Sequence, residues 1–338
     1  MKQIRWGVLG AAKIALERVI PALQATPGAR VVALASRTTE KARAAAQTAG
    51  IARAYGSYQE LLDDPGVDAI YIPLPNHLHV PWSVRALDAG KHVLCEKPIA
   101  LDAAEARQLI AARERTGRLI QEAVMVKTHP RWVGARTLVR EGRLGELRAM
   151  TGFFSYYNVA PQNVRNQAAI GGGGLLDVGF YPITMSRFLF DAEPTRVIGL
   201  MERDPAFGTD RLTSAMLEFP TGQATFTCAT QLSGHQVVDV FGTRGHLLID
   251  LPWSMPSDRA SHLRLDQGAP GASDGVQQIS FPACDQWQVQ CGLFCDAIRG
   301  GGPAPVPIED AIATMTVIDA IARSASSGRW EQPLSVHP

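Results

Sequence analysis

A lysine at the end of an apolar segment is the first residue of the sequence suited to chemistry. The segment Val93-Leu94-Cys95-Glu96 leads directly into Lys97-Pro98, and ligands of doubly wound sheets bind at the carboxyl ends of the strands. The proline biases Lys97 toward extended backbone geometry. The Lys97 ammonium can donate to a carbonyl or hydroxyl oxygen, and burial can bring its pKa toward the operating pH. The alternative is a solvated salt bridge between Glu96 and Lys97.

A carboxylate and a phenol, Asp177 and Tyr181, form the second candidate set. They stand four residues apart in the run Leu175-Leu176-Asp177-Val178-Gly179-Phe180-Tyr181, so they lie on one face of a predicted helix. A polar pair among apolar residues needs partners or a ligand. Four glycines, residues 171–174, precede this helix. Glycines alone are typical of a flexible linker, but a linker seldom leads directly into a helix of this kind.

A glycine turn near the N-terminus is the third candidate, and its chemistry is the binding of a dinucleotide. Gly10, Ala12 and Ala15 occupy the positions of a GxGxx(G/A) fingerprint where a strand turns into a helix. The helix N-terminus favours the pyrophosphate anion. Ala12 stands where the fingerprint has its middle glycine, so an ordinary strand-to-helix turn is the alternative. The residues predicted to contact the dinucleotide here are Gly10, Ala11, Ala12, Lys13 and Ile14.

The residues after the second strand indicate which dinucleotide is bound. The fingerprint predicts an acidic residue about 20 positions on, to hold the ribose hydroxyls, and the sequence has Ser36 and Arg37 there instead. A guanidinium suits a 2′-phosphate, and Lys41 follows one helical turn later. Ser36, Arg37 and Lys41 therefore predict NADP. NAD is the alternative if Arg37 is only a solvated surface residue.

In this order, the motifs resemble those of the glucose-fructose oxidoreductase / inositol dehydrogenase / rhizopine catabolism (Gfo/Idh/MocA) family. Matching segments elsewhere are Pro75-Asn76-His77-Leu78-His79, Ala89-Gly90-Lys91-His92-Val93, Glu122-Ala123-Val124-Met125 and His129-Pro130. The resemblance covers about residues 4–325. The tyrosine at position 181 and the alanine at position 12 make the chain most similar to dimeric dihydrodiol dehydrogenase and NADP-linked xylose dehydrogenase members.

The resemblance implies a role for each candidate residue. It implies that Lys97 acts in catalysis or polarises the substrate, that Asp177 is an acid of the substrate site, and that Tyr181 is the acid/base. It also implies that His79 begins a helix beside the cofactor. The other residues that it places at the cofactor are Pro73, Leu74, Asn76, Glu96 and Lys97.

The activity implied by the resemblance is that of an NAD(P)-dependent oxidoreductase. Such an enzyme moves a hydride between the nicotinamide and the hydroxyl or carbonyl carbon of a sugar, a cyclic polyol or a trans-dihydrodiol. The same family includes a non-catalytic regulator that senses a dinucleotide, which is the alternative. A pure sensor has no need of Lys97, Asp177 and Tyr181 together, so these residues favour the enzyme.

Lys97 and Tyr181 have complementary proton chemistry. An unperturbed tyrosine pKa is about 10, which is too high for a base at neutral pH. A cation about 4 Å away is worth up to ~4 kcal/mol at an effective dielectric of 20, or roughly three pKa units. Lys97 would therefore bring Tyr181 into range, although desolvation of the phenol opposes this. For carbonyl reduction no such shift is needed.

Weaker signals concern substrate and metal binding. Asn163 and Arg165 lie in a polar loop ahead of the glycines and are predicted to bind a hydroxyl-rich substrate, with ordinary loop polarity as the alternative. His77 and His79 have no third ligand nearby in the sequence, and the five cysteines lack the paired spacing of a zinc site. We therefore predict that no metal is bound and that the cysteines are free thiols in a reducing compartment.

A parallel sheet in the first third of the chain must position the lysine and the glycine turn. Strands and helices alternate there with short connections, which is typical of doubly wound α/β domains. Six strands are predicted, at residues 4–9, 30–35, 54–55, 69–72, 92–95 and 120–124. The sequence therefore predicts a Rossmann domain over residues 1–125.

After about residue 125 the pattern predicts an α+β domain. Closely spaced strands indicate antiparallel pairing, and they are predicted at residues 148–157, 196–200, 212–219, 224–230, 236–241 and 247–251. The second domain, residues 126–338, is therefore expected to hold a large open, mostly antiparallel sheet with helices on one face. Residues 252–285 resemble an irregular excursion. Two helices, at residues 286–299 and 309–324, are expected to finish the chain, and the last could pack back toward the first domain.

The length and the net charge of the chain limit the number of domains and the kinds of partner. The 338 residues fit two domains at about 150 residues each, and a formal charge of +1 excludes recruitment of nucleic acid or an anionic membrane by bulk charge. No run approaches the ~18 apolar residues of a membrane span, and no signal-length segment begins the chain, so a cytoplasmic location is predicted. The resemblance implies a homodimer or homotetramer formed through the open sheet.

Overall fold

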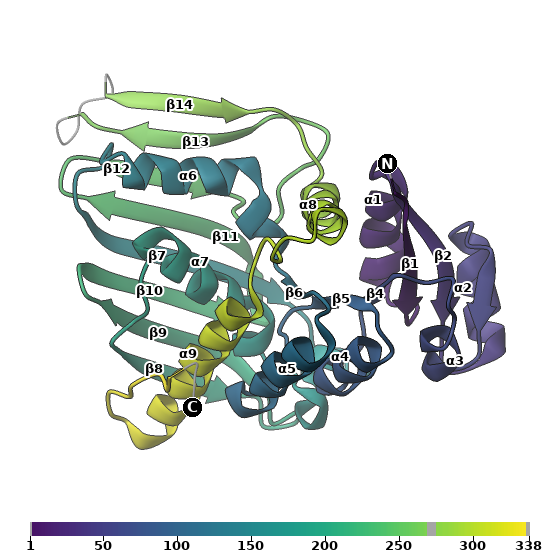
Figure 1. Cartoon of the computed structure of the whole chain (residues 1–338). Coiled ribbons are helices and arrows are strands. Elements are labelled where there is room, and N and C mark those ends of the chain that lie inside the picture. The colour runs from purple at the N-terminus through teal and green to yellow at the C-terminus, as the bar shows by residue number, and fades with distance from the viewer. Residues whose placement is uncertain (1, 269–274, 336–338) are drawn as a thin grey trace. The chain divides into compact units, whose positions relative to one another are not determined.

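The chain forms two compact units. The computed structural model describes residues 2–268 and 275–335. The first unit comprises Met1–Met125 and Asp285–Ile312, and the second comprises Val126–Cys284 and Ala313–Pro338. The sequence assigned all of residues 126–338 to the second domain, so the return of residues 285–312 to the first unit corrects that assignment. Figure 1 traces the elements of both units.

The first unit contains a six-stranded parallel sheet in the order β3-β2-β1-β4-β5-β6. The strands are β1 (Ile4–Leu9), β2 (Ala29–Ala35), β3 (Arg53–Tyr55), β4 (Ala69–Ile72), β5 (His92–Glu96) and β6 (Ile120–Ala123). The connecting helices are α1 (Ile20–Ala25), α2 (Thr39–Thr48), α3 (Tyr58–Leu62), α4 (His79–Asp88) and α5 (Ala103–Thr116). This is the predicted doubly wound Rossmann fold.

Local sequence signals explain where these helices begin and end. The side chains of Thr38, Ser57 and Asp102 each accept a hydrogen bond from a backbone N–H three residues on, which satisfies a donor that the helix itself leaves unpaired. Helix α5 ends at Gly117, where φ is 63°, a conformation that glycine adopts without steric cost. The segments between each strand end and the following helix line the carboxyl edge of the sheet.

Helix α8 (Gln286–Gly300) completes the core of the first unit although it lies far along the chain. Cys291, Phe294 and Cys295 on one face of α8 are fully buried in a cluster that also contains Trp6 and Leu23. The rings of Trp6 and Phe294 lie 6.0 Å apart. Burial of this apolar face explains why α8 belongs to the first unit.

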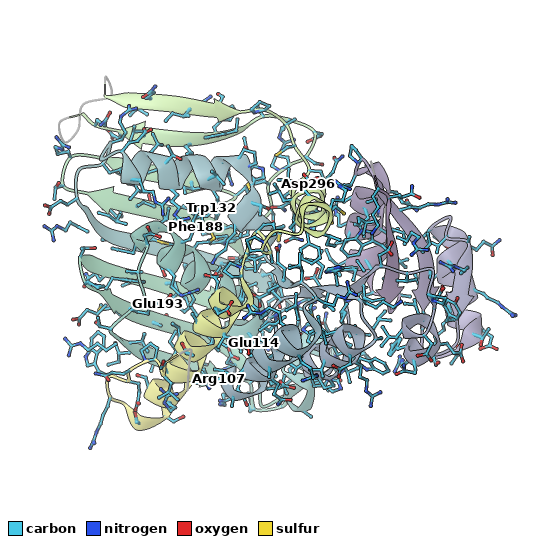
Figure 2. All side chains as sticks on the ribbon, in the orientation of Figure 1. Arg107, Glu114, Trp132, Phe188, Glu193 and Asp296 are labelled. Atoms are coloured by element: carbon cyan, nitrogen blue, oxygen red, sulfur yellow. The ribbon has the colours of Figure 1, made fainter. Side chains whose placement is uncertain are left out.

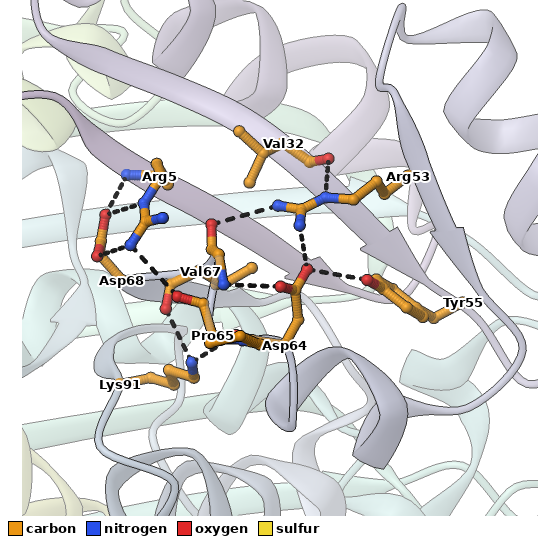
Figure 3. Close-up of polar contacts among 10 residues, drawn as sticks. Arg5, Val32, Arg53, Tyr55, Asp64, Pro65, Val67, Asp68 and Lys91 are labelled. Atoms are coloured by element: carbon orange, nitrogen blue, oxygen red, sulfur yellow. Dashed lines mark hydrogen bonds and ion pairs between the residues drawn. The ribbon is translucent and has the colours of Figure 1, made fainter.

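A polar network ties together the amino ends of the parallel strands (Figure 3). Arg5 of β1 donates two side-chain hydrogen bonds to Asp68, which precedes β4. Arg53, the first residue of β3, forms an ion pair with Asp64 at 2.6 Å. The Lys91 ammonium, just before β5, donates to the backbone carbonyl oxygens of Asp64 and Val67. This network lies at the edge of the sheet opposite to the carboxyl ends of the strands, so its role is structural.

The second unit contains an eight-stranded sheet in the order β14-β13-β12-β11-β7-β10-β9-β8. The strands are β7 (Leu147–Tyr157), β8 (Arg196–Arg203), β9 (Asp210–Phe219), β10 (Gly222–Ala229), β11 (Gln231–Gly242), β12 (His246–Asp250), β13 (Ser261–Asp266) and β14 (Val276–Phe281). β7 and β10 pair in parallel, and the other neighbours are antiparallel. The predicted large, open, mostly antiparallel sheet is therefore confirmed.

Residues 252–285 are more regular than the sequence suggested. The segment supplies β13 and β14, which pair over six residues and form one edge of the sheet. Leu263 and Leu265 are fully buried while His262 and Arg264 are exposed, which is the alternation of a strand with one buried face. The Pro, Ser, Asp and Gly residues that dominate the composition lie mainly in the connections. Of the excursion, residues 269–274 lie outside the described residues.

Helices cover one face of the large sheet. These helices are α6 (Pro130–Arg140), α7 (Phe180–Phe190) and α9 (Ile308–Ser327). The C-terminal part of α9 contacts β8, because the Gly199 N–H donates a hydrogen bond to the Ser324 hydroxyl. Trp132 of α6 and Phe188 of α7 lie on this helix-bearing face (Figure 2). No helix within the described residues is long and apolar enough to cross a membrane.

Candidate active site

The glycine turn after β1 has the geometry that a dinucleotide needs. Gly10 has a φ of +108°, which a side chain would disfavour, and its N–H donates to the Ala35 carbonyl oxygen. A Cβ at Gly10 would lie 3.1 Å from the Leu74 side chain. Helical winding starts at Lys13 and passes through a π turn at Ala15–Val19. The first N–H groups of a helix have no intrahelical partner, so this turn fits a pyrophosphate.

The positive residues predicted to select NADP lie beyond the end of β2. Arg37 and Lys41 are both exposed. Ser36 is buried, and its N–H donates to the Tyr55 carbonyl oxygen on the neighbouring strand β3. Because β2 pairs with β1, Arg37 follows the same edge of the sheet as Gly10. The two exposed cations fit a 2′-phosphate better than the buried Ser36 does.

His79 joins two turns at the carboxyl edge and does not present its ring outward. Its side chain is 1% exposed, with Nδ1 2.7 Å from the Pro98 carbonyl oxygen and Nε2 2.7 Å from the Leu74 carbonyl oxygen. Burial lowers the pKa of His79 to about 4, so the ring is neutral and donates from one nitrogen at a time. His79 therefore links the turn after β4 to the turn that carries Lys97, and it begins α4, as the resemblance implied; its place beside the cofactor stays a prediction.

Lys97 follows β5 and is half-buried, and its bond to Pro98 is a cis peptide. The preceding carboxylate, Glu96, accepts a hydrogen bond of 2.6 Å from the Tyr71 hydroxyl of β4. The remaining residues predicted to line the cofactor follow β4, where Pro73 and Leu74 are buried and Asn76 is half-buried. Gly10, Arg37, Leu74 and Lys97 thus all lie in turns at the carboxyl ends of neighbouring strands.

Asp177 and Tyr181 begin the helix that crosses the second unit. Asp177 lies in a π turn, Leu175–Gly179, and Tyr181 lies in the first turn of α7. Both side chains meet β7: the Tyr156 hydroxyl donates to Asp177 Oδ2 at 2.7 Å, and the Phe154 and Tyr181 rings lie 5.7 Å apart. The predicted shared face is therefore present, although its first turn is wider than an α-helical one.

Arg165 completes the surroundings of Asp177. Its Nε donates to Asp177 Oδ2 at 2.6 Å, and this carboxylate raises the pKa of Arg165 above its usual value. Burial, with the Asp177 charge, raises the pKa of the Tyr156 phenol, so this group stays protonated and donates. Asn163 instead serves the local backbone, because its side-chain oxygen accepts from the Arg165 N–H. Of the two predicted substrate-binding residues, the structure brings only Arg165 to Asp177.

Aromatic side chains enclose the Tyr181 ring, which is 7% exposed. The Trp253 ring lies 5.4 Å from Tyr181 and 5.4 Å from Trp132, on which it stacks. The segment before Trp253 is fixed by Arg131, whose guanidinium donates to the carbonyl oxygens of Asp250 and Leu251. Trp253, Phe154 and Tyr156 were not predicted from the sequence. The alternation along residues 148–157 could have placed Phe154 and Tyr156 on one face of a strand, but not against Tyr181.

Within the part of the chain that the structure describes, no three His, Cys, Asp or Glu side chains are grouped to hold a metal. His77 and His79 lie at the start of α4, where His79 is engaged as described above. All five cysteines are thiols, and Cys284 lies 3.2 Å from the His129 ring. The residues present include groups that can bind a nucleotide and a polar substrate. They also include a lysine and a tyrosine, which can move a proton.

Comparison with known proteins matches both units to models of one protein family. Residues 4–124 match the Gfo/Idh/MocA model described as an oxidoreductase family with an NAD-binding Rossmann fold, and residues 132–248 match the Gfo/Idh/MocA C-terminal domain. The chain belongs to the Gfo/Idh/MocA family. It is an oxidoreductase, as the motifs predicted, and its Rossmann domain binds a nicotinamide dinucleotide.

Individual Gfo/Idh/MocA relatives match along nearly the whole chain. An uncharacterized oxidoreductase, ORF334 of Rhizobium meliloti, is 48% identical over 98% of this chain and 99% of its own. A dTDP-3,4-didehydro-2,6-dideoxy-alpha-D-glucose 3-reductase of Streptomyces violaceoruber is 39% identical over 89% and 87%. D-xylose 1-dehydrogenase (NADP(+)) 2 of Haloferax volcanii is 34% identical over 96% and 98%. KijD10, a 3-ketoreductase from Actinomadura kijaniata solved with NADP and TDP-benzene, superimposes with a TM-score of 0.89 at 30% identity, covering 96% of this chain and 98% of that one.

Proposed function

We propose that this oxidoreductase transfers a hydride between NADP and the hydroxyl or carbonyl carbon of a sugar, with cyclic polyols and trans-dihydrodiols as neighbouring substrate classes. The observation that carries the proposal is the edge of the parallel sheet, where Gly10, Arg37 and Lys97 follow neighbouring strands. This edge combines a pyrophosphate turn, a cation for a 2′-phosphate and a hydrogen-bond donor for the substrate oxygen. When NADP is bound there, its nicotinamide supplies or accepts the hydride.

Lys97 and Tyr181 are the residues proposed to act on the substrate oxygen. In carbonyl reduction the Lys97 ammonium donates a hydrogen bond that polarises the carbonyl, and the Tyr181 phenol supplies the proton to the developing alkoxide. In the oxidative direction Tyr181 takes the hydroxyl proton. Aromatic side chains pack around the Tyr181 ring and leave the residue only 7% exposed, which limits proton exchange with solvent during the transfer.

Asp177 is proposed to hold a second hydroxyl group of the substrate. Its Oδ2 already accepts from Tyr156 and Arg165, so the carboxylate is fixed in orientation before substrate arrives. A carboxylate held in this way accepts from a sugar hydroxyl at little cost in side-chain entropy. Arg165, whose side chain is 43% exposed, extends the same polar edge and is proposed to contact the substrate.

The deciding experiment is a turnover screen that follows NADPH absorbance. The panel should contain dTDP-linked keto-sugars, free aldoses, inositols and trans-dihydrodiols, each with NADP and with NAD. Turnover of at least one sugar by the wild-type chain, lost in Tyr181→Phe, is the expected result. NADP binding without turnover of any member by the wild-type chain would contradict the proposal and favour a dinucleotide sensor.

We also propose that the protein is a homo-oligomer formed through the open face of the large sheet and that it works in the reducing cytoplasm. Ile198, Met216, Phe153 and Val237 alternate with buried residues along their strands, so they face away from the helices. Leu200 beside them is 78% exposed. Light scattering coupled to gel filtration should give a dimer or tetramer mass, and Leu200→Asp should shift the protein toward the monomer. The five thiols are in keeping with a reducing compartment.

A further inference from the structure

A buried carboxylate from β9 holds the start of the helix that carries Asp177 and Tyr181. Asp210, the first residue of β9, is 6% exposed. Its Oδ2 accepts from the Leu175 N–H at 2.6 Å and from the Thr213 hydroxyl at 3.1 Å. Leu175 is the first residue of the π turn that contains Asp177. Asp210 therefore satisfies one of the N–H groups that a helix start leaves unpaired.

Two of the four glycines, Gly172 and Gly173, are required by the packing around this contact. Gly173 has a φ of +129°, and a Cβ there would lie 2.0 Å from Asp210 Oδ1. On the other side of the chain, a Cβ at Gly172 would lie 2.6 Å from the Arg165 carbonyl oxygen, which accepts from the Gly173 N–H. The glycines thus pass between the Asp210 carboxylate and the backbone of the loop that carries Arg165. This run is a tightly packed junction, not a flexible linker.

We propose that Asp210 is a positioning residue of the reaction, because its carboxylate fixes the π turn and with it the places of Asp177 and Tyr181. The inference rests on the proposed function of those two residues. Asp210 itself acts only through the backbone of Leu175 and does not touch substrate. Burial raises the pKa of Asp210 to about 6, so the carboxylate form is present under ordinary assay conditions. The ionisable groups whose charges interact with it are Arg203 on β8, Cys228 on β10 and Tyr156 on β7.

The test compares Asp210→Ala and Asp210→Asn with a matched control, Asp204→Ala. Asp204 is also buried, and its Oδ1 also accepts hydrogen bonds from backbone N–H groups, those of Ala206 and Phe207. Unlike Asp210, it fixes a turn after β8. Three quantities are measured for each variant: hydrogen exchange of the amides of residues 175–179, kcat for the substrate found in the screen, and the Kd for NADP. Thr213→Val, which removes one support of the carboxylate, serves as a milder variant if Asp210→Ala does not fold.

Asp210→Ala is expected to speed exchange at residues 175–179 by about 10-fold and to lower kcat by about 10-fold, since a buried N–H loses its acceptor. The Kd for NADP should stay within about 2-fold, because the cofactor residues lie in the other unit. Asp210→Asn keeps an acceptor oxygen and should restore both quantities to within about 3-fold of wild type. Thr213→Val should give a smaller acceleration confined to the same amides.

Unchanged exchange at residues 175–179 in Asp210→Ala would overturn the proposal, as would equal losses of kcat in Asp210→Ala and Asp204→Ala at similar thermal stability. The exchange measurement needs no substrate. It therefore decides the role of Asp210 even if the screen finds no turnover, a result that would instead overturn the proposed function.

Discussion

The Asp177 carboxylate receives hydrogen bonds from a guanidinium and a phenol on two different segments, whereas Tyr181 is surrounded by aromatic rings. The two candidate residues of α7 and its π turn therefore have different surroundings. Asp177 is held electrostatically and suits binding. Tyr181 packs among aromatic rings and is only 7% exposed, which suits proton transfer in a site largely closed to water.

Tyr181→Phe and Lys97→Met are each expected to lower kcat about 100-fold or more, with the Kd for NADP nearly unchanged. If the two residues serve one proton-transfer step, the double variant should lose little more than either single variant, because groups that act as a unit are not additive. Steady-state kinetics and titration with NADPH measure both quantities. Tyr157→Phe, at a position that is 67% exposed, is the control and should keep full turnover. Near-native turnover of Tyr181→Phe would refute the scheme.

Arg37→Ala is expected to weaken NADP binding by about 10- to 100-fold, the usual value of a charge-assisted contact, and to leave NAD binding unchanged. The ratio of the two dissociation constants, measured by fluorescence titration, is the deciding quantity. Arg30→Ala is the matched control, since Arg30 lies near the opposite end of the same strand, β2. An unchanged ratio in Arg37→Ala would remove Arg37 from cofactor selection.

At the residue scale, the sequence could predict candidates that stand at strand ends, because a strand that ends in a turn fixes where the next side chain lies. Lys97 and Arg37 are of this kind. Asp210 and Trp253 could not be predicted, because each acts on a segment far away in the sequence. His79 shows the same limit: its position at the start of α4 was implied correctly, but its two carbonyl contacts depend on the turn after β5.

At the scale of elements, both helices that begin at the candidate residues start with a π turn, at Ala15–Val19 and at Leu175–Gly179. Such turns are rare and are found frequently at functional sites. Apolar spacing predicted ordinary helices in both places, because a single wide turn barely changes which residues are apolar. At Leu175–Gly179 the first N–H of the turn donates to Asp210, a residue far away in the sequence, so a local pattern does not report this contact.

Gly173→Ala is expected to destabilise the second unit by more than about 3 kcal/mol, because it combines an unfavourable backbone conformation with a collision against Asp210. The control is Gly208→Ala. Gly208 also has a positive φ, of +69°, but a Cβ there would meet no atom within 4 Å, so strain alone should cost about 1–2 kcal/mol. Chemical denaturation of each variant measures the difference. Equal losses would show that the glycine run is not packed against Asp210.

Strands β13 and β14, the last two at one side of the large sheet, were not predicted because of the composition of their surroundings. Their connections are rich in turn-forming residues, and this signal outweighed the short alternation of Leu263 and Leu265 between exposed residues. Their predecessors in the same sheet were predicted because they are longer or more apolar. A strand with one buried face needs a buried side chain only at every second position, so the few apolar residues of β13 are enough to form it and too few to stand out.

At the scale of the whole molecule, binding residues and stabilising residues of the first unit lie at opposite edges of its sheet. The carboxyl edge carries the candidate site, and the amino edge carries the polar network of Figure 3. Hydrogen bonds from Arg5 lower the pKa of Asp68 below its usual value. A carboxylate with a lowered pKa contributes stability above its unfolded pKa and loses it as the pH falls through the folded pKa. The network should therefore stabilise the unit at neutral pH and fail in acid.

Asp68→Asn is expected to lower the free energy of unfolding by about 1–2 kcal/mol at pH 7 without changing kcat. The difference from wild type should stay constant down to about pH 4 and shrink below it. Thermal unfolding across this range measures the difference. Asp88→Asn, which breaks an exposed ion pair with Arg115, is the control and should cost about 0.5 kcal/mol or less. A difference that grows on acidification would contradict the assignment.

Helix α8 has a consequence for how the protein is made. The ribosome completes all six strands of the Rossmann sheet by Ala123, but Cys291, Phe294 and Cys295 emerge more than a hundred and fifty residues later. Until then the cluster around Trp6 and Leu23 lacks one of its walls, and apolar surface stays open to water. The second unit is thus synthesised after the start of the first unit and before its end. The nascent cofactor domain therefore keeps an exposed apolar surface, prone to aggregation, until nearly the entire chain is translated.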